Sequence, residues 1–188
     1  MSQPRYTPIH VIVATATMFV LAMCSQLWSA PGMPVAYAIP CGINCLDVTN
    51  APVASLSLNG RDQTVSYALT FSLENQSALG WNVTITSTQF ISASLIHTLA
   101  PSASAITAIT AVCQPAQTCT TLPTNAVTYP VAVPAGNPAP TAIKFYNAAA
   151  GSGEGTFDLS TTITISVPAN AYAGSYSSTI TLAYVSGP

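Results

Sequence analysis

The chain has 188 residues, of which 49% are hydrophobic and only 4% are charged, and its formal net charge is −2. Three Lys and Arg side chains are too few to neutralise a phosphate backbone, so the composition excludes nucleic-acid binding. High hydrophobicity with low charge is also the opposite of what a disordered chain shows. We therefore expect a folded domain that has few groups able to do acid–base chemistry.

The first 38 residues predict an export signal. Arg5 and His10 lie in a short polar segment around the start of an apolar run, Ile9 to Met23. Small residues occupy the first and third positions before a cut placed after Ala38, as signal peptidase requires. The mature protein would then begin at Ile39 and be secreted. Arg61 and Lys144 would be its two cations against five carboxylates.

Two alternatives to a cleaved signal exist. The apolar run could be a membrane anchor, but it is shorter than the roughly 20 residues that a span requires. It could also be a lipoprotein signal ending at Cys24, but Met23 stands where a small residue is expected. The other end, Ser186-Gly187-Pro188, carries no hydrophobic tail. We therefore expect no membrane span and no covalent anchor in the mature chain.

Four cysteines follow the predicted cut: Cys41, Cys45, Cys113 and Cys119. An even number in an exported chain favours two disulfides, and three pairings are possible. Turn-forming residues separate the members of each close pair, which favours Cys41–Cys45 and Cys113–Cys119 over the two pairings that link distant cysteines. Neither pair has the spacing of a zinc site, and we expect no metal and no other cofactor.

Alternation of apolar and polar residues dominates the rest of the chain and predicts half-buried β-strands. It is clearest over residues 64–73, 81–86, 157–167 and 176–184, and weaker over 53–58, 105–112, 127–133 and 142–146. Asn59-Gly60 suits a tight hairpin between the first two strands, and Pro168 with Gly174 bounds a closing hairpin. About eight strands with one wet face predict one all-β domain over residues 39–188, an antiparallel β-sandwich of Greek-key or immunoglobulin-like type.

Three segments resemble a known family. They are Leu58 to Val65; Gly80 to Thr86, which begins Gly-Trp-Asn-Val-Thr; and the closing stretch from Val167 to Leu182, which contains V-P-A and A-G-x-Y. Together they resemble the WxL domain of Gram-positive surface proteins, although the Trp-x-Leu tripeptides themselves are absent. The resemblance implies a WxL-like β-sandwich that is secreted and held non-covalently at the cell wall.

The closing A-G-x-Y strand is also similar to the last strand of spore-coat-U and archaic chaperone–usher pilin domains. Those subunits polymerise when the N-terminal segment of one completes the sheet of the next. Here the segment 39–52 is short and lacks the long alternating apolar run that a donor strand needs. Polymerisation is therefore the alternative interpretation.

Few residues are candidates for catalysis or ligand binding. His97 is the only histidine after the predicted cut, and no nucleophile elbow accompanies it, so we interpret it as a surface residue. Among the carboxylates, Glu154 and Asp158 suggest at most a glycosidase-like pair. Asp47, Asp62 and Glu74 suggest at most a calcium site. The pair flanks the glycine-rich turn over 151–155 and the strand it opens, so a solvated loop explains it better, and the calcium set lacks the alternating acidic loop that such a site requires. Trp81 shares the apolar face of a strand with Val83 and Ile85, which favours a core position over a sugar-stacking platform.

The sequence thus predicts a non-catalytic structural or adhesive protein of the cell surface. Its expected partner is a cell-wall polymer or another surface protein. The alternative is a subunit of an extracellular filament or surface layer that self-assembles by β-strand complementation. A hydrolase or carbohydrate-binding module is a third possibility, which the shortage of acids and histidines disfavours.

Overall fold

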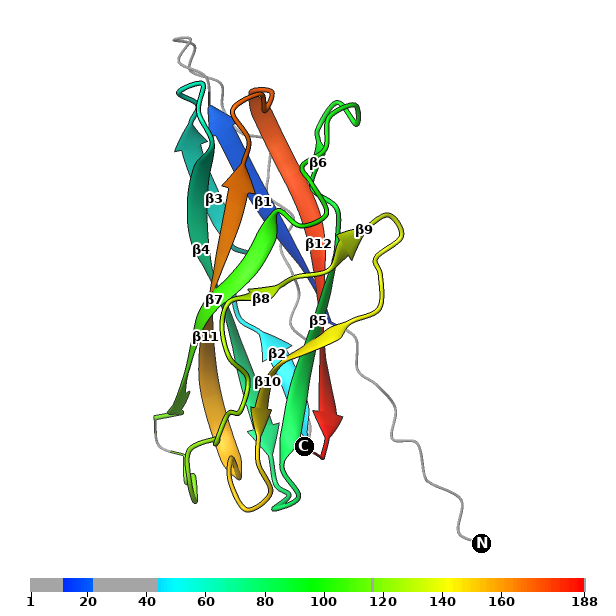
Figure 1. The fold of residues 1–188 in the computed structure, drawn as a ribbon. Coiled ribbons are helices and arrows are strands. Elements are labelled where there is room, and N and C mark those ends of the chain that lie inside the picture. Colours follow the sequence, from blue (N-terminus) through cyan, green and yellow to red (C-terminus); the bar gives the residue numbers. More distant parts are fainter. Residues whose placement is uncertain (1–11, 22–43, 116, 188) are drawn as a thin grey trace, which may run out of the picture.

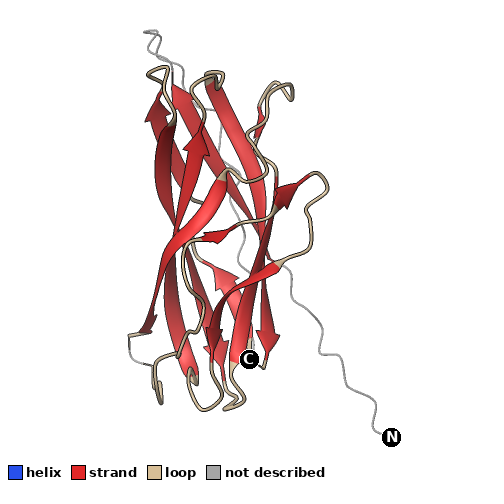
Figure 2. Cartoon of the chain, in the orientation of Figure 1, coloured by secondary structure: helices blue, strands red, loops and turns tan. Residues whose placement is uncertain are grey.

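Two β-sheets pack face to face around a single hydrophobic core in the computed structural model, which describes residues 12–21, 44–115 and 117–187 (Figure 1). These residues form no helix, and loops alone join the strands (Figure 2). The predicted all-β sandwich is confirmed. Its Greek-key or immunoglobulin-like type stays a prediction.

The first sheet has the order β10-β5-β12-β1-β3, with β6 beside β12 and β9 beside β5. Its pairs are antiparallel except β1 with β3 and β5 with β9. Its strands are β1 (Ile12–Leu21), β3 (Val53–Ser57), β5 (Trp81–Thr88), β6 (Ile91–Ser92), β9 (Ala135–Gly136), β10 (Ile143–Ala148) and β12 (Gly174–Ser186).

The second sheet has the order β2-β4-β11-β7-β8 and is antiparallel throughout. Its strands are β2 (Cys45–Val48), β4 (Gln63–Asn75), β7 (Ser104–Cys113), β8 (Val131–Ala132) and β11 (Gly155–Val167). The described residues thus contain more strands than the eight expected. Of the additional strands, β2, β6 and β9 have too few residues to show a clear period-two pattern, whereas β1 has ten residues and lies within the predicted export signal, so the sandwich includes a strand outside the predicted domain 39–188.

Inward-facing residues of the long strands make the core, as their alternation predicts. On β4 and β11 the fully buried positions include Leu69, Phe71, Leu73, Phe157, Leu159, Ile163 and Ile165. On β12 they are Tyr176, Ser178, Ile180 and Leu182. Between them Ser177 is exposed, and Ser175, Thr179 and Thr181 are partly exposed.

Both predicted hairpins are wrong in one respect, because their strands belong to different sheets. β3 lies in the first sheet and β4 in the second, so Asn59-Gly60 turns the chain from one sheet to the other. The closing strands β11 and β12 are separated in the same way. Alternation identifies a strand and its buried face, but it does not reveal the strand's hydrogen-bonding partner.

Strand β5 differs from the prediction because both of its faces are largely covered. Besides its core residues, Asn82, Thr86 and Ser87 are also buried. The segment leading to β10 covers the outer side at Thr86, whose Oγ1 donates to the Pro140 carbonyl oxygen at 2.7 Å. Ser87 lies on the face of Trp81 and Ile85, and its amide donates to the Pro134 carbonyl oxygen at 3.0 Å where β9 pairs with β5. A hydroxyl on an alternating strand therefore does not always mark a wet face.

Trp81 is fully buried, and its indole Nε1–H donates to the Gly153 carbonyl oxygen at 2.8 Å. Its ring centroid lies 5.6 Å from that of Tyr146. The preceding Gly80 has φ of 78°, and a Cβ there would lie 2.5 Å from the carbonyl oxygen of Ala148. The Gly-Trp pair is thus a packing requirement, since only glycine fits this close approach.

The predicted Cys113–Cys119 disulfide is confirmed, with an S–S distance of 2.04 Å. It follows that neither residue can be linked to the N-terminal cysteines. Cys45 is disulfide-bonded as well, but its predicted partner Cys41 lies outside the described residues, so that pairing stays a prediction. Ala38 and Ile39 also lie outside the described residues, and the cut between them is not tested.

Candidate functional site

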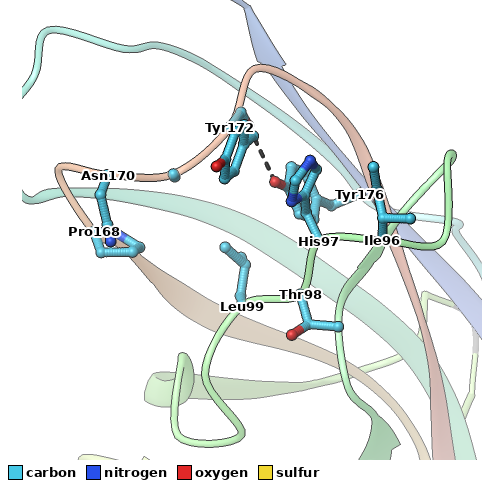
Figure 3. A pocket seen from close by; sticks show the side chains of 9 residues that line it. Ile96, His97, Thr98, Leu99, Pro168, Asn170, Tyr172 and Tyr176 are labelled. Atoms are coloured by element: carbon cyan, nitrogen blue, oxygen red, sulfur yellow. Dashed lines mark hydrogen bonds between the residues drawn. The ribbon is translucent and has the colours of Figure 1, made fainter.

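Two connections meet at one end of the sandwich, at the top of Figure 1. They are the loop that follows β6, residues 93–103, and the β11–β12 connection, residues 168–173. Residues 96–99 of the first, and Pro168 with residues 170–172 of the second, line a pocket of about 210 Å³ together with Tyr176 (Figure 3). We call this region the loop end.

Backbone hydrogen bonds fold the first loop tightly. The Ser92 amide donates to the His97 carbonyl oxygen and the Leu95 amide to that of Ser92, both at 2.8 Å. The His97 amide donates to Ser92 Oγ at 3.1 Å. Leu95 takes a φ of 61°, which is uncommon for a bulky residue. As a result Leu95 and Ile96 project into solvent, with 71% and 74% of their surface exposed.

Local bonds also fix the β11–β12 connection. The Ala171 amide donates to the Pro168 carbonyl oxygen at 2.9 Å. The Tyr176 hydroxyl donates to the carbonyl oxygen of Tyr172 at 3.1 Å. Burial raises the pKa of Tyr176 above its ordinary value, so this hydroxyl keeps its proton at neutral pH. These bonds present the Tyr172 side chain, 61% exposed, at the loop end.

The two loops are joined by an aromatic stack. The rings of His97 and Tyr172 lie 3.7 Å apart between centroids and are nearly parallel, at 11°. Leu99 is buried and lies on the core side of the same pocket (Figure 3). Asn170 and Thr98 contribute polar groups to the lining. Among the described residues that line the pocket none is a carboxylate, Lys or Arg. This arrangement suits the binding of a neutral ligand better than the making or breaking of bonds.

Three large exposed hydrophobic side chains gather at this end: Leu95, Ile96 and Tyr172, which we call the apolar cap. Exposed apolar residues that occur singly are ordinary on a protein surface, whereas a contiguous group marks an interaction site. Leu79, Val112, Leu122 and Val185 are exposed too, and they lie near the opposite end of the sandwich. The apolar cap is the better candidate for a contact surface because it lies beside the pocket that His97 and Tyr172 line.

Three of the five carboxylates considered in the sequence accept hydrogen bonds, whereas the buried Asp47 Oδ1 has no hydrogen-bond partner among the described residues. Asp158 Oδ1 accepts from Ser72 Oγ and from Gln114 Nε2, both at 2.8 Å. Asp62 Oδ1 accepts from the Ala169 amide at 2.8 Å. Glu74 Oε1 accepts from the side chain of a residue two positions away, at 2.7 Å. Within residues 12–21, 44–115 and 117–187, no group of three or more His, Cys, Asp or Glu could hold a metal ion.

Sequence reasoning missed the pairing of His97 with Tyr172. The closing motif did point to the β11–β12 connection, which carries Tyr172. No local pattern around His97 indicates that it faces this connection, because the two loops are far apart in the sequence and are brought together by the pairing of β6 with β12.

No protein-family model, curated protein or solved structure matches this chain. The WxL-like resemblance therefore stays a prediction. In the described part of the chain, no helix is both long enough and apolar enough to cross a membrane.

Proposed function

We propose that this protein is an exported, non-catalytic structural or adhesive protein of the cell surface. It binds a cell-wall polymer through the apolar cap and the neutral pocket beside it. The observation that carries this proposal is the gathering of Leu95, Ile96 and Tyr172 at one end of a rigid sandwich, next to the stacked rings of His97 and Tyr172.

The chemistry of the loop end supports a neutral polymer. Binding pockets are mostly apolar and aromatic, with a few polar groups that set orientation. Here aromatic and aliphatic surface lies beside the amide of Asn170 and the hydroxyl of Thr98. Sugar rings have weakly polar faces and hydroxyl rims, so a wall glycan matches both kinds of group. The pocket lining offers no carboxylate, Lys or Arg as a partner for a strongly charged ligand.

Other features support a place outside the cell. The Cys113–Cys119 disulfide suits an oxidising compartment. Many outward-facing strand positions carry Thr or Ser, and these hydroxyls bond across strands, as between Ser66 and Thr164 at 2.9 Å. The WxL-like segments, the immunoglobulin-like sandwich type and the predicted export signal agree with the same location.

Co-sedimentation with purified peptidoglycan sacculi tests this function. The test variant replaces all three residues of the apolar cap with serine. The matched control is Leu79→Ser with Leu122→Ser, which removes two exposed leucines at the opposite end. We expect the control to bind like the wild type and the cap variant to lose at least about tenfold in affinity. No binding by the wild type, or equal loss in both variants, would contradict the proposal.

A second candidate is a subunit of a surface filament assembled by β-strand complementation. The observation that favours it is the position of β1, since a segment predicted to be cut away forms an interior strand of the first sheet. Electron microscopy and light scattering of the secreted protein test for polymers. Monomers at all concentrations, with and without other secreted proteins of the source cell, would contradict this candidate.

A further inference from the structure

Strand β1 lies between two strands that do not pair with each other. Residues 12–20 run antiparallel to residues 174–182 of β12, and residues 17–21 run parallel to Val53–Ser57 of β3. On its other edge β12 pairs with β5 and β6. In the described chain β3 pairs with β1 alone. Loss of β1 would therefore leave facing edges on β12 and β3, one strand apart.

This gap is held open from the β3 side. Before β3, Asn50 is fixed to β4: its Nδ2 donates to the Ala68 carbonyl oxygen, and its Oδ1 accepts from the Thr70 amide, both at 2.8 Å. After β3, Gln63 Nε2 donates to the Ser57 carbonyl oxygen at 3.1 Å. Both ends of β3 are thus tied to the second sheet. Closing the gap would move β3 by about 4.8 Å, one strand spacing, against these ties.

The β12 edge lacks the features that protect free edges. From Gly174 to Leu182 it reads Gly-Ser-Tyr-Ser-Ser-Thr-Ile-Thr-Leu, with no charged residue and no proline. Natural edge strands are usually blunted by charges, proline or bulges. The inward residues Tyr176, Ile180 and Leu182 are buried while β1 is in place. Such an edge is suited to accept another strand.

We propose that, once residues 1–38 are removed, the gap between β12 and β3 is an acceptor slot for a strand of a different polypeptide. The incoming strand runs antiparallel to β12, spans about nine residues, is uncharged and has apolar residues at alternate positions. The uncharged segment Ile12–Leu21 shows the chemistry that the slot takes. The proposal rests on the second candidate function and names the source of the completing strand.

The same chain does not supply this strand. After the predicted cut, only residues 39–44 precede the first strand of the mature chain. At about 3.3 Å per residue, six residues reach about 20 Å, whereas nine paired residues of β12 span about 30 Å. The long strands β4, β11 and β12 are already core elements of the sandwich. A donor segment on another protein is what remains.

The test uses the secreted, processed protein and a fluorescent peptide with the sequence of residues 12–21, carrying two added lysines for solubility. The control peptide contains Thr15→Pro and Thr17→Pro, which removes ladder donors. We expect saturable binding at least tenfold tighter for the first peptide. Hydrogen exchange should slow on binding for amides of β12 and β3. An uncut full-length chain should not bind the peptide, because β1 fills the slot.

Several outcomes would overturn the proposal. If β12 and β3 amides are already protected without peptide and no peptide binds, the slot has closed. If the protein polymerises alone and takes up no peptide, the filament function stands but the separate donor does not. If the processed protein is unfolded by circular dichroism, folding on addition of the peptide supports the slot. Failure to fold or to bind refutes it, as does a secreted protein that retains residues 1–38.

Discussion

Leu182→Ala tests whether β12 packs its inward face into the core of the sandwich. Leu182 is 1% exposed and pairs with Ile85 of β5, itself fully buried. The substitution removes three carbons, at about 0.8 kcal/mol for each buried carbon, so transfer alone costs about 2.4 kcal/mol. The unfilled space adds to this, and such changes cost about 2–5 kcal/mol in total. That is a large part of the roughly 5–15 kcal/mol that stabilises a domain.

The matched control is Thr181→Ala, the neighbouring position on the outward face, which should cost less than about 1 kcal/mol. Urea unfolding of the secreted protein measures both changes in the free energy of unfolding. Equal m-values would show that the variants unfold from comparable folded states. A loss below about 1 kcal/mol for Leu182→Ala, or equal losses for the two variants, would refute the burial of the inward face of β12 in the core.

Three further predictions concern buried polar groups and the disulfide. Asn75→Ala should lower the free energy of unfolding in urea by about 1–3 kcal/mol, because it leaves the Tyr184 hydroxyl, which donates to Asn75 at 3.0 Å, without its acceptor. Asn50→Ala removes an asparagine at a half-buried site and should cost less, and the reverse order would contradict this prediction. The double variant Cys113→Ser with Cys119→Ser should lose about 2 kcal/mol or less of unfolding free energy in the same assay, because this disulfide closes only a short loop. A loss above about 4 kcal/mol would contradict the view that the disulfide stabilises this loop alone. Burial, and secondarily a neighbouring tyrosine, raises the pKa of Tyr146 to about 12, so the folded state keeps a proton that the unfolded state releases near pH 10. The Tm of the wild type should therefore fall as the pH rises from about 10 to about 12, and the Tm of Tyr146→Phe should fall less. An identical decline in both proteins would show that Tyr146 does not contribute to this loss of stability.

Local patterns predict the long strands but not how they pair. The alternation in β4, β11 and β12 identified their buried residues because these strands have one face on the core and one towards solvent. The covered outer face of β5 carries Thr86, which is chemically the same as an exposed threonine, so its burial depends on a distant segment. An apolar run such as Ile12–Leu21 is equally suited to an export signal and to a buried strand. Its place beside β12 could not be predicted from its composition.

The loop end illustrates the same limit for a site. The closing motif predicted the connection that carries Tyr172, but the stack with His97 depends on two loops that are far apart in the sequence. Leu95 gave no signal either, because its exposure follows from the backbone of a tight turn. Sequence alone identified one side of the pocket, and the packing of the strands supplied the other.

The most direct test of the adhesive function is the affinity of the secreted protein for purified sacculi, measured for the wild type and for Tyr172→Ala. This side chain lies on both the apolar cap and the ring stack, and 61% of its surface is free to meet a partner. We expect Tyr172→Ala to bind at least about tenfold more weakly, a loss of about 1.4 kcal/mol, with an unchanged Tm. Equal affinities of the two proteins, or no measurable binding by the wild type, would contradict wall binding through the loop end.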